Sequence, residues 1–289
     1  MKNKIVLVRN FSYDGFLKQA EALRRHLTEL GADAEIADNL DLSLRKDEEL
    51  QFDKAVFLDK DIPLGLRMER LGIRLYNSIH AIERCDDKRR LPALLGTSVK
   101  MPETLVFPLS FSEGDASDCF VKKIGALLGY PVVAKEAYGS LGNQVILLQN
   151  EKEVRSYQKA HRVVPHLYQK YIAESSGRDM RLYVVGGRTV AAMIRENRTD
   201  FRANLAQGGT AMPFTPSTAL QETAAEVCLR LGLDFAGVDF LFSDEGEPYL
   251  CEVNSNAFFT GISACTGVDV AREISLYILR DASPSGKSF

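Results

Sequence analysis

One stretch, residues 235–256, constrains the fold of this chain most, because it has the pattern of a β-hairpin with two unlike faces. Two apolar runs flank a turn-forming cluster at residues 244–248. If Glu245 and Gly246 form a two-residue tip, alternation along the strands sets the pairing. One face then pairs Val238 with Val253, Phe240 with Cys251, and Phe242 with Tyr249. That face is apolar and suits a buried core.

The other face of this predicted hairpin carries acids. Asp239 lies opposite Glu252, and Asn254 follows on the same side because alternate strand residues share a face. Directly opposed carboxylates repel each other unless a positive charge lies between them. Two carboxylates and an amide oxygen suit a hard divalent cation such as Mg²⁺. A solvent-exposed sheet face with incidental acids is the alternative, and the hairpin alone leaves both interpretations open.

The composition is that of an ordinary soluble globular protein, with 289 residues, 45% hydrophobic and 26% charged, enough for two or three subdomains. A net charge of -3 gives no reason to expect nucleic-acid or membrane binding. The first apolar run, residues 5–8, is too short for a signal peptide or a membrane span. Five scattered cysteines without a C-x-x-C pair favour free thiols over zinc or disulfides. We therefore expect a cytoplasmic protein.

The first third of the chain alternates strand and helix patterns. Strands are predicted at residues 5–8, 34–36, 54–59 and 75–76, and helices after Gly15, from about residue 67 and over 78–84. The first helix carries leucines on one face and ends at Gly31. This alternation predicts a small parallel sheet of Rossmann-like type. It contains no G-x-G-x-x-G motif, so nothing marks it as a dinucleotide site.

A shift to strand and turn composition at residue 97 predicts a domain boundary. Beyond it, residues 111–118 have loop composition and residues 282–289 read as a frayed tail. Strands are predicted at 131–135, 145–148, 167–172, 181–185 and 189–194, and helices at 120–128, 215–231 and 269–280. Together with the hairpin, these elements place the chain in the α/β class.

Two segments have the character of phosphate-binding sites. The strand that ends at Lys135 runs into a loop, residues 138–143, whose Gly139 and Gly142 let backbone N–H groups approach anionic oxygens. An ordinary hairpin with a surface lysine is the alternative. A second lysine, Lys88, lies in the charged run 85–90, which also has the composition of a solvated helix start.

A long polar segment, residues 195–209, ends in two glycines and carries four polar residues of interest, Arg195, Arg198, Arg202 and Asn204. Such a segment inside a compact domain is more often a binding loop than a spacer. Its arginines suit an anionic partner such as glutamate, and they suit a triphosphate equally well.

Four segments in order complete the pattern: Asp179-Met180-Arg181, residues 200–205 with Gly208-Gly209, Ala236-Gly237-Val238-Asp239, and Glu252-Val253-Asn254. With the lysines and the glycine loop, they resemble the RimK-like ligases of the ATP-grasp superfamily over residues 77–280, and more loosely before them. Those enzymes join amino acids, often glutamate, to a carboxylate. The resemblance implies a Rossmann-like pre-ATP-grasp domain at 1–96, an ATP-grasp small lobe at 97–172 and a C-terminal lobe with the metal site at 173–289.

The resemblance also implies roles for single residues. Asp239, Glu252 and Asn254 would hold Mg²⁺, with Mn²⁺ as an alternative. ATP would contact Lys88, Lys135, Tyr138, Gly139, Ser140, Gly142, Gln169, Lys170, Tyr171, Ile172, Asp179, Arg195 and Asn204. Arg202 and Arg195 would be catalytic and stabilise the oxyanion that forms on the substrate, since phosphoryl transfer depends mainly on charge neutralisation.

The expected function is an ATP- and Mg²⁺-dependent carboxylate–amine ligase. It would add an amino acid, with glutamate favoured, to a peptide, protein or small-molecule carboxylate through an acyl phosphate, releasing ADP and phosphate. Alternatives are the same chemistry on an amino-carrier protein of lysine or arginine biosynthesis or on a coenzyme, and a non-catalytic nucleotide-binding module. We expect no nucleic-acid or membrane partner, and a homo-oligomer stays open.

Two departures from the family pattern concern the substrates. Lys170 stands where the family often has Glu, and residues 255–259 differ from RimK in a segment that lies beside the acceptor site in the family. The acceptor therefore stays open. Asn10, Tyr13 and Asn77, at predicted strand ends, are candidates for shaping the acceptor pocket, although strand-end polar residues often only form turns.

Overall fold

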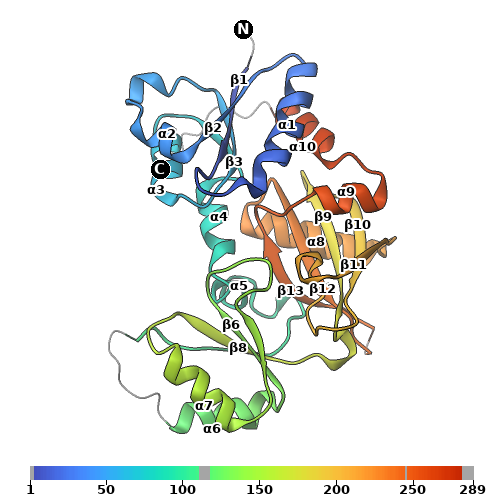
Figure 1. The fold of residues 1–289 in the computed structure, drawn as a ribbon. Helices are drawn as coiled ribbons and strands as arrows, with labels where there is room; N and C mark the ends of the chain where they lie inside the picture. The colour runs from blue at the N-terminus through green and yellow to red at the C-terminus, as the bar shows by residue number, and fades with distance from the viewer. Residues whose placement is uncertain (1–2, 111–117, 245, 282–289) are drawn as a thin grey trace.

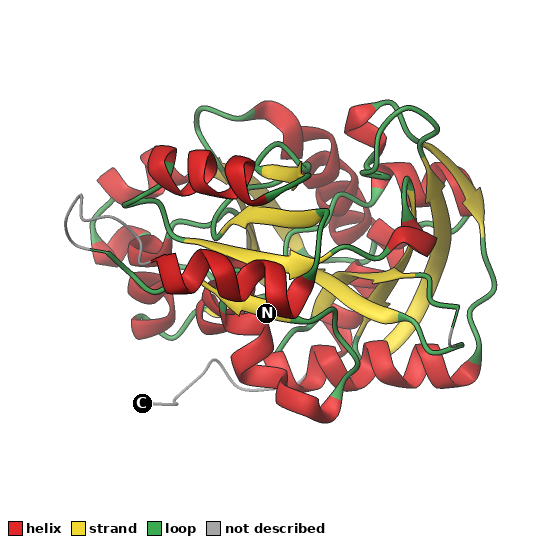
Figure 2. Cartoon of the chain, turned by 90° about the horizontal axis from the view of Figure 1, so that it is seen from below, coloured by secondary structure: helices red, strands yellow, loops and turns green. Residues whose placement is uncertain are grey.

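The computed structural model describes residues 3–110, 118–244 and 246–281. Three sheets follow one another along an elongated body, with the first strands at one end and β6 and β8 at the other (Figure 1). Helices lie outside the strands (Figure 2). Residues 111–117 of the predicted loop 111–118, the tip residue Glu245 and the tail 282–289 lie outside the described residues, and Asp118 begins a helix instead. Among the described helices, none is long and apolar enough to cross a lipid bilayer.

The first sheet is parallel, as the β-α-β alternation predicted. It has the order β2 (Asp33–Asp38), β1 (Lys4–Arg9), β3 (Lys54–Leu58) and β4 (Arg74–Tyr76). Its helices are α1 (Leu17–Glu29), α2 (Asn39–Leu44), α3 (Ile62–Arg70) and α4 (Ile79–Asp86). The predicted start of helix α3, at about residue 67, is too late. The helix begins at Ile62, because Asp61 caps its N-terminus and Pro63 occupies its first turn.

The second sheet is antiparallel and carries Lys135 and the glycine loop, for which we predict phosphate binding. Its order is β5 (Thr104–Val106), β8 (His166–Lys170), β6 (Val132–Glu136) and β7 (Val145–Leu148). Helices α6 (Asp118–Leu128) and α7 (Glu151–Ala160) pack on it through one apolar cluster. Helix α7 was not predicted, although Asn150 caps it by accepting a hydrogen bond from the Glu153 backbone N–H. The short helix α5 (Arg90–Leu95) follows the charged run.

The third sheet contains the hairpin. Its order is β11 (Thr210–Pro213), β10 (Arg188–Glu196), β9 (Arg178–Val185), β12 (Phe235–Leu241) and β13 (Tyr249–Asn254). Helix α8 (Thr218–Leu231) buries the residues predicted for its inner face, and α9 (Thr260–Thr266) and α10 (Val270–Arg280) follow. Neither β11 nor α9 was predicted. Strand β10 runs through Arg195, which we had expected in the polar loop.

The hairpin register agrees with the prediction up to Asp239 and differs beyond it. Val238 pairs with Val253 and Asp239 with Glu252, but Phe240 then faces Leu250, because the register shifts by one residue after Asp239. The expected partner, Cys251, instead lies beside Lys135, whose Nζ is 3.6 Å from its Sγ. Leu250 takes the core position and is buried. The predicted pairing of Phe242 with Tyr249 is also wrong, since Tyr249 pairs with Leu241.

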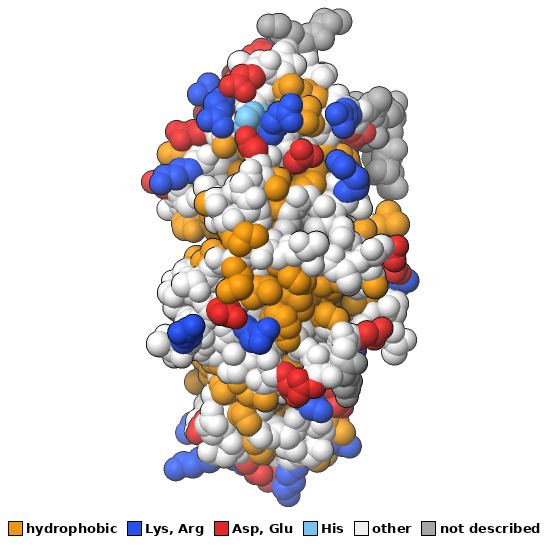
Figure 3. All heavy atoms as spheres, turned by 90° about the vertical axis from the view of Figure 1, so that its right-hand side faces the viewer, with side chains coloured by type: hydrophobic (Ala, Val, Ile, Leu, Met, Phe, Trp, Pro, Cys, Tyr) orange, Lys and Arg blue, Asp and Glu red, His pale blue; other side chains and the backbone are white. Residues whose placement is uncertain are grey.

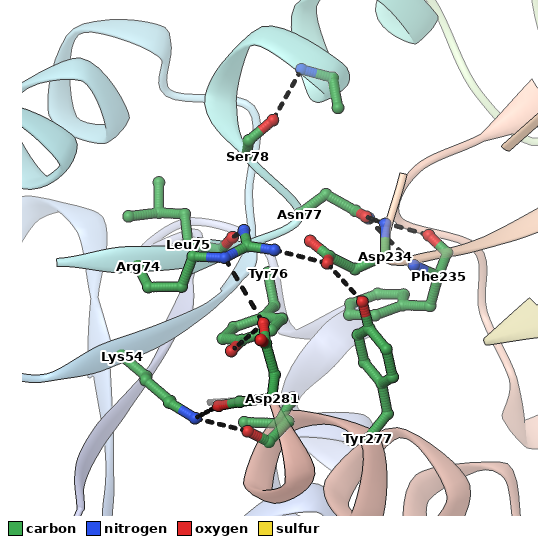
Figure 4. A network of polar contacts seen from close by, with 12 residues as sticks. Lys54, Arg74, Leu75, Tyr76, Asn77, Ser78, Asp234, Phe235, Tyr277 and Asp281 are labelled. Atoms are coloured by element: carbon green, nitrogen blue, oxygen red, sulfur yellow. Dashed lines mark hydrogen bonds and ion pairs between the residues drawn. The ribbon is translucent and has the colours of Figure 1, made fainter. Parts of the chain in front are cut away.

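A buried polar junction connects the first sheet to the hairpin (Figure 4). Asn77, fully buried after β4, donates hydrogen bonds of 2.9 Å to the carbonyls of Phe235 and Ser255 and accepts one of 2.7 Å from the Asp234 N–H. Arg74 donates to the Asp234 carboxylate at 2.6 Å. The start of β12 and the end of β13 are therefore tied to the N-terminal sheet.

Helix α10 also connects the two ends of the chain. Its Ile274 and Ile278 share one apolar cluster with Leu23 and Leu27 of α1, and the two helices lie side by side (Figure 1). On the right-hand face of that view, apolar side chains gather at mid-height, at the level of the third sheet, and charged ones are more frequent towards the ends (Figure 3). The edge strand β11 carries an exposed Met212.

Candidate active site

A cavity of about 110 Å³ between the second and third sheets collects most of the predicted site residues. They come from segments far apart in the sequence: the charged run before α5, the strand ends and loop of the second sheet, and the facing strands of the third. The predicted residues that line it are Lys88, Lys135, Gly139, Ser140, Gly142, Gln169, Lys170, Tyr171, Ile172, Asp179, Arg195, Arg202, Asn204, Asp239 and Glu252. Two predicted residues, Tyr138 and Asn254, are not in its lining.

Two arginines neutralise the acid cluster on the hairpin. Arg181 donates to both oxygens of Asp239, with Nε–Oδ1 2.7 Å and Nη2–Oδ2 2.6 Å. Arg195 donates to Asp239 at 3.0 Å and to both oxygens of Asp179 at 2.7 and 2.6 Å. Burial disfavours the charged form of Asp239, but the two guanidinium groups outweigh it and lower the pKa of this carboxyl. The positive charge that the opposed acids required is thus partly supplied by the protein.

Arg181 was not among the predicted site residues. The signal was nevertheless present, because it lies two residues after Asp179 and therefore on the same face of β9. The register places it directly opposite Asp239. Arg181 is identified as the neighbour of Asp239 only by the pairing of β9 with β12, and the sequence does not predict which strands pair.

The hairpin face has the donor set of a hard divalent cation. Asp239 pairs with Glu252 across the two strands, and the Asn254 amide nitrogen is 3.5 Å from Asp239 Oδ2. Glu252 is half-buried, and Lys88 Nζ is 3.8 Å from its Oε1. Within the described ranges there is no group of three or more His, Cys, Asp or Glu side chains placed to hold a metal. Two carboxylates and an amide still fit Mg²⁺, which commonly takes one or two protein carboxylates together with substrate phosphates.

The glycine loop, residues 138–143, lines the cavity and is held by hydrogen bonds from other segments. Lys88 donates from Nζ to the Gly139 carbonyl at 2.8 Å, and Arg202 donates to the Gly142 carbonyl at 2.7 Å. Gln207, which we did not predict, donates to the Leu141 carbonyl at 3.3 Å and to Asn143 Oδ1 at 3.0 Å. Burial lowers the pKa of Lys88, and the nearby Glu252 partly offsets this. Of the two predicted lysines, Lys88 contacts the loop, whereas Lys135 Nζ lies 3.6 Å from Cys251 Sγ.

The end of β8 and the segment after it form the opposite wall. Gln169 donates to Thr104 Oγ1 at 3.0 Å, and the exposed Lys170 is held by its backbone N–H on the Glu103 carbonyl at 2.8 Å. Arg178, another unpredicted lining residue, lies 3.9 Å above the ring of Phe242. The backbone of this segment is thus fixed by the sheet, whatever the charge at position 170.

A second cavity, of about 340 Å³, adjoins the first. Lys88, Gly139, Ser140, Arg195, Asn204 and Glu252 line both. Asn254 and Tyr13 line the second, so Tyr13 lies where we expected an acceptor-pocket residue. Asn77 does not line this cavity, because its side chain is used in the buried junction, where it holds the carbonyl of the lining residue Ser255. Asn10 donates to Asp59 at 3.3 Å and lines neither cavity.

Tyr138 lies at the outer side of the glycine loop. Its ring is 49% exposed, and its hydroxyl is 3.5 Å from Asp87 Oδ2. Asp87 is itself held by Arg89 at 2.9 and 2.6 Å. Tyr138 therefore contacts the charged run and lines neither cavity.

Comparisons of sequence point to one family. The chain is 35% identical over 229 residues to beta-citrylglutamate synthase B of Danio rerio, covering 76% of this chain and 54% of that protein. It is 37% identical over 224 residues to probable alpha-L-glutamate ligase 2 of Pseudoalteromonas atlantica, covering 76% and 71%. The chain thus spans about half the length of the first of these relatives.

Solved structures share the fold at low sequence identity. The D-cycloserine synthetase DcsG aligns with a TM-score of 0.74 at 17% identity over 96% of this chain and 98% of that one. The ATP-grasp ligase PsnB, complexed with Mg, ADP and a variant of its minimal precursor, aligns with a TM-score of 0.72 at 15% identity over 98% and 100%. The RimK-like ATP-grasp domain family matches residues 85–278. The chain therefore belongs to the family of RimK-like ATP-grasp domain proteins.

Proposed function

We propose that this protein is an ATP-dependent carboxylate–amine ligase. The observation that carries the proposal is the shared lining of the two cavities, where Lys88, Arg195, Asn204 and Glu252 face both. A nucleotide in the first cavity would direct its terminal phosphate at this junction, and a substrate carboxylate would reach it from the second. Phosphoryl transfer needs positioning and charge neutralisation, and this junction supplies both.

In this proposal the residues of the chain divide the work. Lys88 and Lys135 bind the phosphates, and the glycine loop excludes water over them. Asp239, Glu252 and Asn254 would hold Mg²⁺, or Mn²⁺ in its place, which when bound offsets negative charge on the phosphates. Arg195 orients the carboxylates of Asp179 and Asp239. Arg202, which also holds the loop through the Gly142 carbonyl, would stabilise the oxyanion that forms when the amine attacks.

The added amino acid in this proposal is glutamate, because relatives are named as glutamate-adding ligases or glutamate-containing product synthases. Arg195 at the junction and Arg181 in the second cavity suit its two carboxylates. We further propose that the protein is cytoplasmic. We also propose that it has the three units predicted from the sequence, residues 1–96, 97–172 and 173–289. Each range contains one of the three sheets.

The test is Glu252→Gln, since Glu252 is half-buried and its nearest cation, Lys88, is 3.8 Å away. The change removes a carboxylate with little effect on packing. We expect substrate-dependent release of ADP and phosphate to fall at least about 100-fold, because a metal contributes several kcal/mol of charge stabilisation. The exposed Glu174, outside both cavities, provides the control Glu174→Gln, which should keep full activity. Unchanged substrate-dependent turnover in Glu252→Gln would contradict the proposal. Nucleotide binding without turnover by the unaltered protein would indicate a non-catalytic module.

A further inference from the structure

The second cavity has a polar end and an apolar end. The polar end is the junction with the first cavity, at Arg195 and Asn204. From there the cavity continues to Tyr13 and Phe16 of the N-terminal unit and to Phe258 after β13. Its volume of about 340 Å³ exceeds that of the first cavity, about 110 Å³. The space therefore accommodates a molecule with more than a reacting carboxylate.

The polar end favours an anion. Among the charged residues that line the second cavity, Lys60 pairs with Asp86 and Lys88 lies near Glu252, which leaves the guanidinium groups of Arg181 and Arg195. The carboxylates of Asp179 and Asp239, which neutralise the two arginines, line only the first cavity. A carboxylate that enters the second cavity thus meets guanidinium groups before it meets their acidic partners.

The apolar end is an aromatic wall, made of Tyr13, Phe16 and Phe258. Phe16 and Phe258 stack with ring centroids 4.5 Å apart and an interplanar angle of 8°, and Tyr13 meets Phe16 edge-on at 5.9 Å. Phe16 and Phe258 are half-buried and Tyr13 is 43% exposed, so the wall retains open ring surface. Open aromatic surface inside a cavity favours an apolar or aromatic group of a ligand.

Tethers on both sides of Phe258 hold the wall in place. Phe259 donates its backbone N–H to Gln19 Oε1 at 2.8 Å, and Asn256 donates its side-chain N–H to the Asp59 carbonyl at 2.9 Å. Both partners belong to the N-terminal unit. The wall is therefore built before a ligand arrives, which reduces the entropy that binding has to overcome.

We propose that the carboxylate substrate of this enzyme carries an aromatic side group, which stacks on the wall of Tyr13, Phe16 and Phe258 while its carboxylate lies at Arg195. This proposal rests on the ligase function proposed above. Phe258 is then a specificity-determining residue. A purely acidic aliphatic substrate would bind less well, because it has no group that could stack on the wall.

The experiment compares two acceptors of the same backbone, N-acetyl-L-phenylalanine and N-acetyl-L-aspartate, with ATP, Mg²⁺ and glutamate. We expect kcat/KM for the aromatic acceptor to exceed that for the acidic one by about tenfold or more, the effect of one well-stacked ring. Phe258→Ala should remove this preference by lowering only the aromatic value, and the KM for ATP should not change. Phe258→Leu, which keeps apolar volume, should lose part of the preference. Phe11→Ala, at an exposed ring that lines neither cavity, is the matched control.

Binding of the two acceptors, measured by calorimetry on the full chain, separates the two proposals. If the protein binds the aromatic acceptor more tightly and Phe258→Ala abolishes this preference, the inference about the wall is supported. If, in addition, neither acceptor supports ATP-dependent turnover, only the proposed ligase function is refuted. Equal binding of both acceptors, or an equal loss of both in Phe258→Ala, overturns the inference about the wall whether or not turnover occurs.

Discussion

Arg181 faces Asp239 across neighbouring strands of the third sheet and donates to both of its carboxylate oxygens, at 2.7 and 2.6 Å. The residue proposed to bind the metal is therefore also the acceptor of a buried ion pair. Arg195 adds a third hydrogen bond and connects this pair to Asp179. Two carboxylates and two guanidinium groups thus balance one another on the same face of the third sheet as the predicted metal ligands.

Removing one of these arginines should lower the stability of the folded protein. Arg181→Ala leaves Asp239 buried with one cationic partner in place of two, so we expect the free energy of unfolding to fall by about 3 kcal/mol or more. Urea denaturation measures this. Arg188→Ala is the matched control, since Arg188 is exposed and 3.7 Å from Glu273, and it should cost less than about 1 kcal/mol. Similar costs for the two variants would contradict the buried-cluster interpretation.

The buried junction at Asn77 should couple the N-terminal sheet to the hairpin. Asn77→Ala removes partners from the Phe235 and Ser255 carbonyls and from the Asp234 N–H, and we expect a loss of about 2–4 kcal/mol, because buried polar groups left unpaired are costly. Asn150→Ala, at an exposed helix N-cap, should cost about 1 kcal/mol. If chemical denaturation shows Asn77→Ala to be the milder of the two, the junction is not the connection described here.

Gln207 should hold the glycine loop closed. Gln207→Ala removes two hydrogen bonds to residues 141 and 143, each contributing about 0.5–1.5 kcal/mol, so the loop should open several-fold more often. Cleavage by chymotrypsin after Tyr138 or Leu141 reports this opening, and melting temperature should not change. Gln221→Ala, whose amide reaches only the Pro216 carbonyl among the hydrogen bonds of the described residues, is the control. Equal cleavage of both variants would show that Gln207 does not restrain the loop.

His166 predicts a pH dependence of stability. It stacks on Phe107 at 4.6 Å, its Nδ1 is 2.8 Å from the Val164 carbonyl, and its Nε2 is buried without a partner in the described residues. Burial lowers the pKa of His166 below its ordinary value. The unfolded state therefore binds the proton first as the pH falls below about 6.5, and stability should decrease from pH 7 towards pH 5.

Replacing His166 tests that dependence. His166→Phe keeps a ring on Phe107 and should make the free energy of unfolding less dependent on pH between 7 and 5. His80→Gln, at an exposed position, should leave the dependence unchanged. A slope that is the same in His166→Phe and in the unaltered protein would assign the effect to other groups.

Local patterns predicted much of the architecture. The β-α-β alternation, the inner face of α8 and the pairing of Asp239 with Glu252 follow from periods of 3.6 and 2, which depend on neighbours along the chain. The same rules missed α2, α7, α9 and β11, elements whose ends depend on capping and on sheet neighbours.

The hairpin shows where local rules end. Asp239 and Glu252 pair as the assumed turn and the strand alternation predicted, although the register shifts directly after Asp239. The sequence could not state that Cys251 turns towards Lys135, since β6 is 116 residues away in the chain, nor that Leu250 fills the core in its place. It also could not state that Arg181 faces Asp239, because strand order is decided by packing of whole sheets. The sequence predicted the residue types and most of the faces, Cys251 excepted, because both depend on neighbours along the chain. The tertiary structure alone decided which distant charges and rings meet at the two cavities.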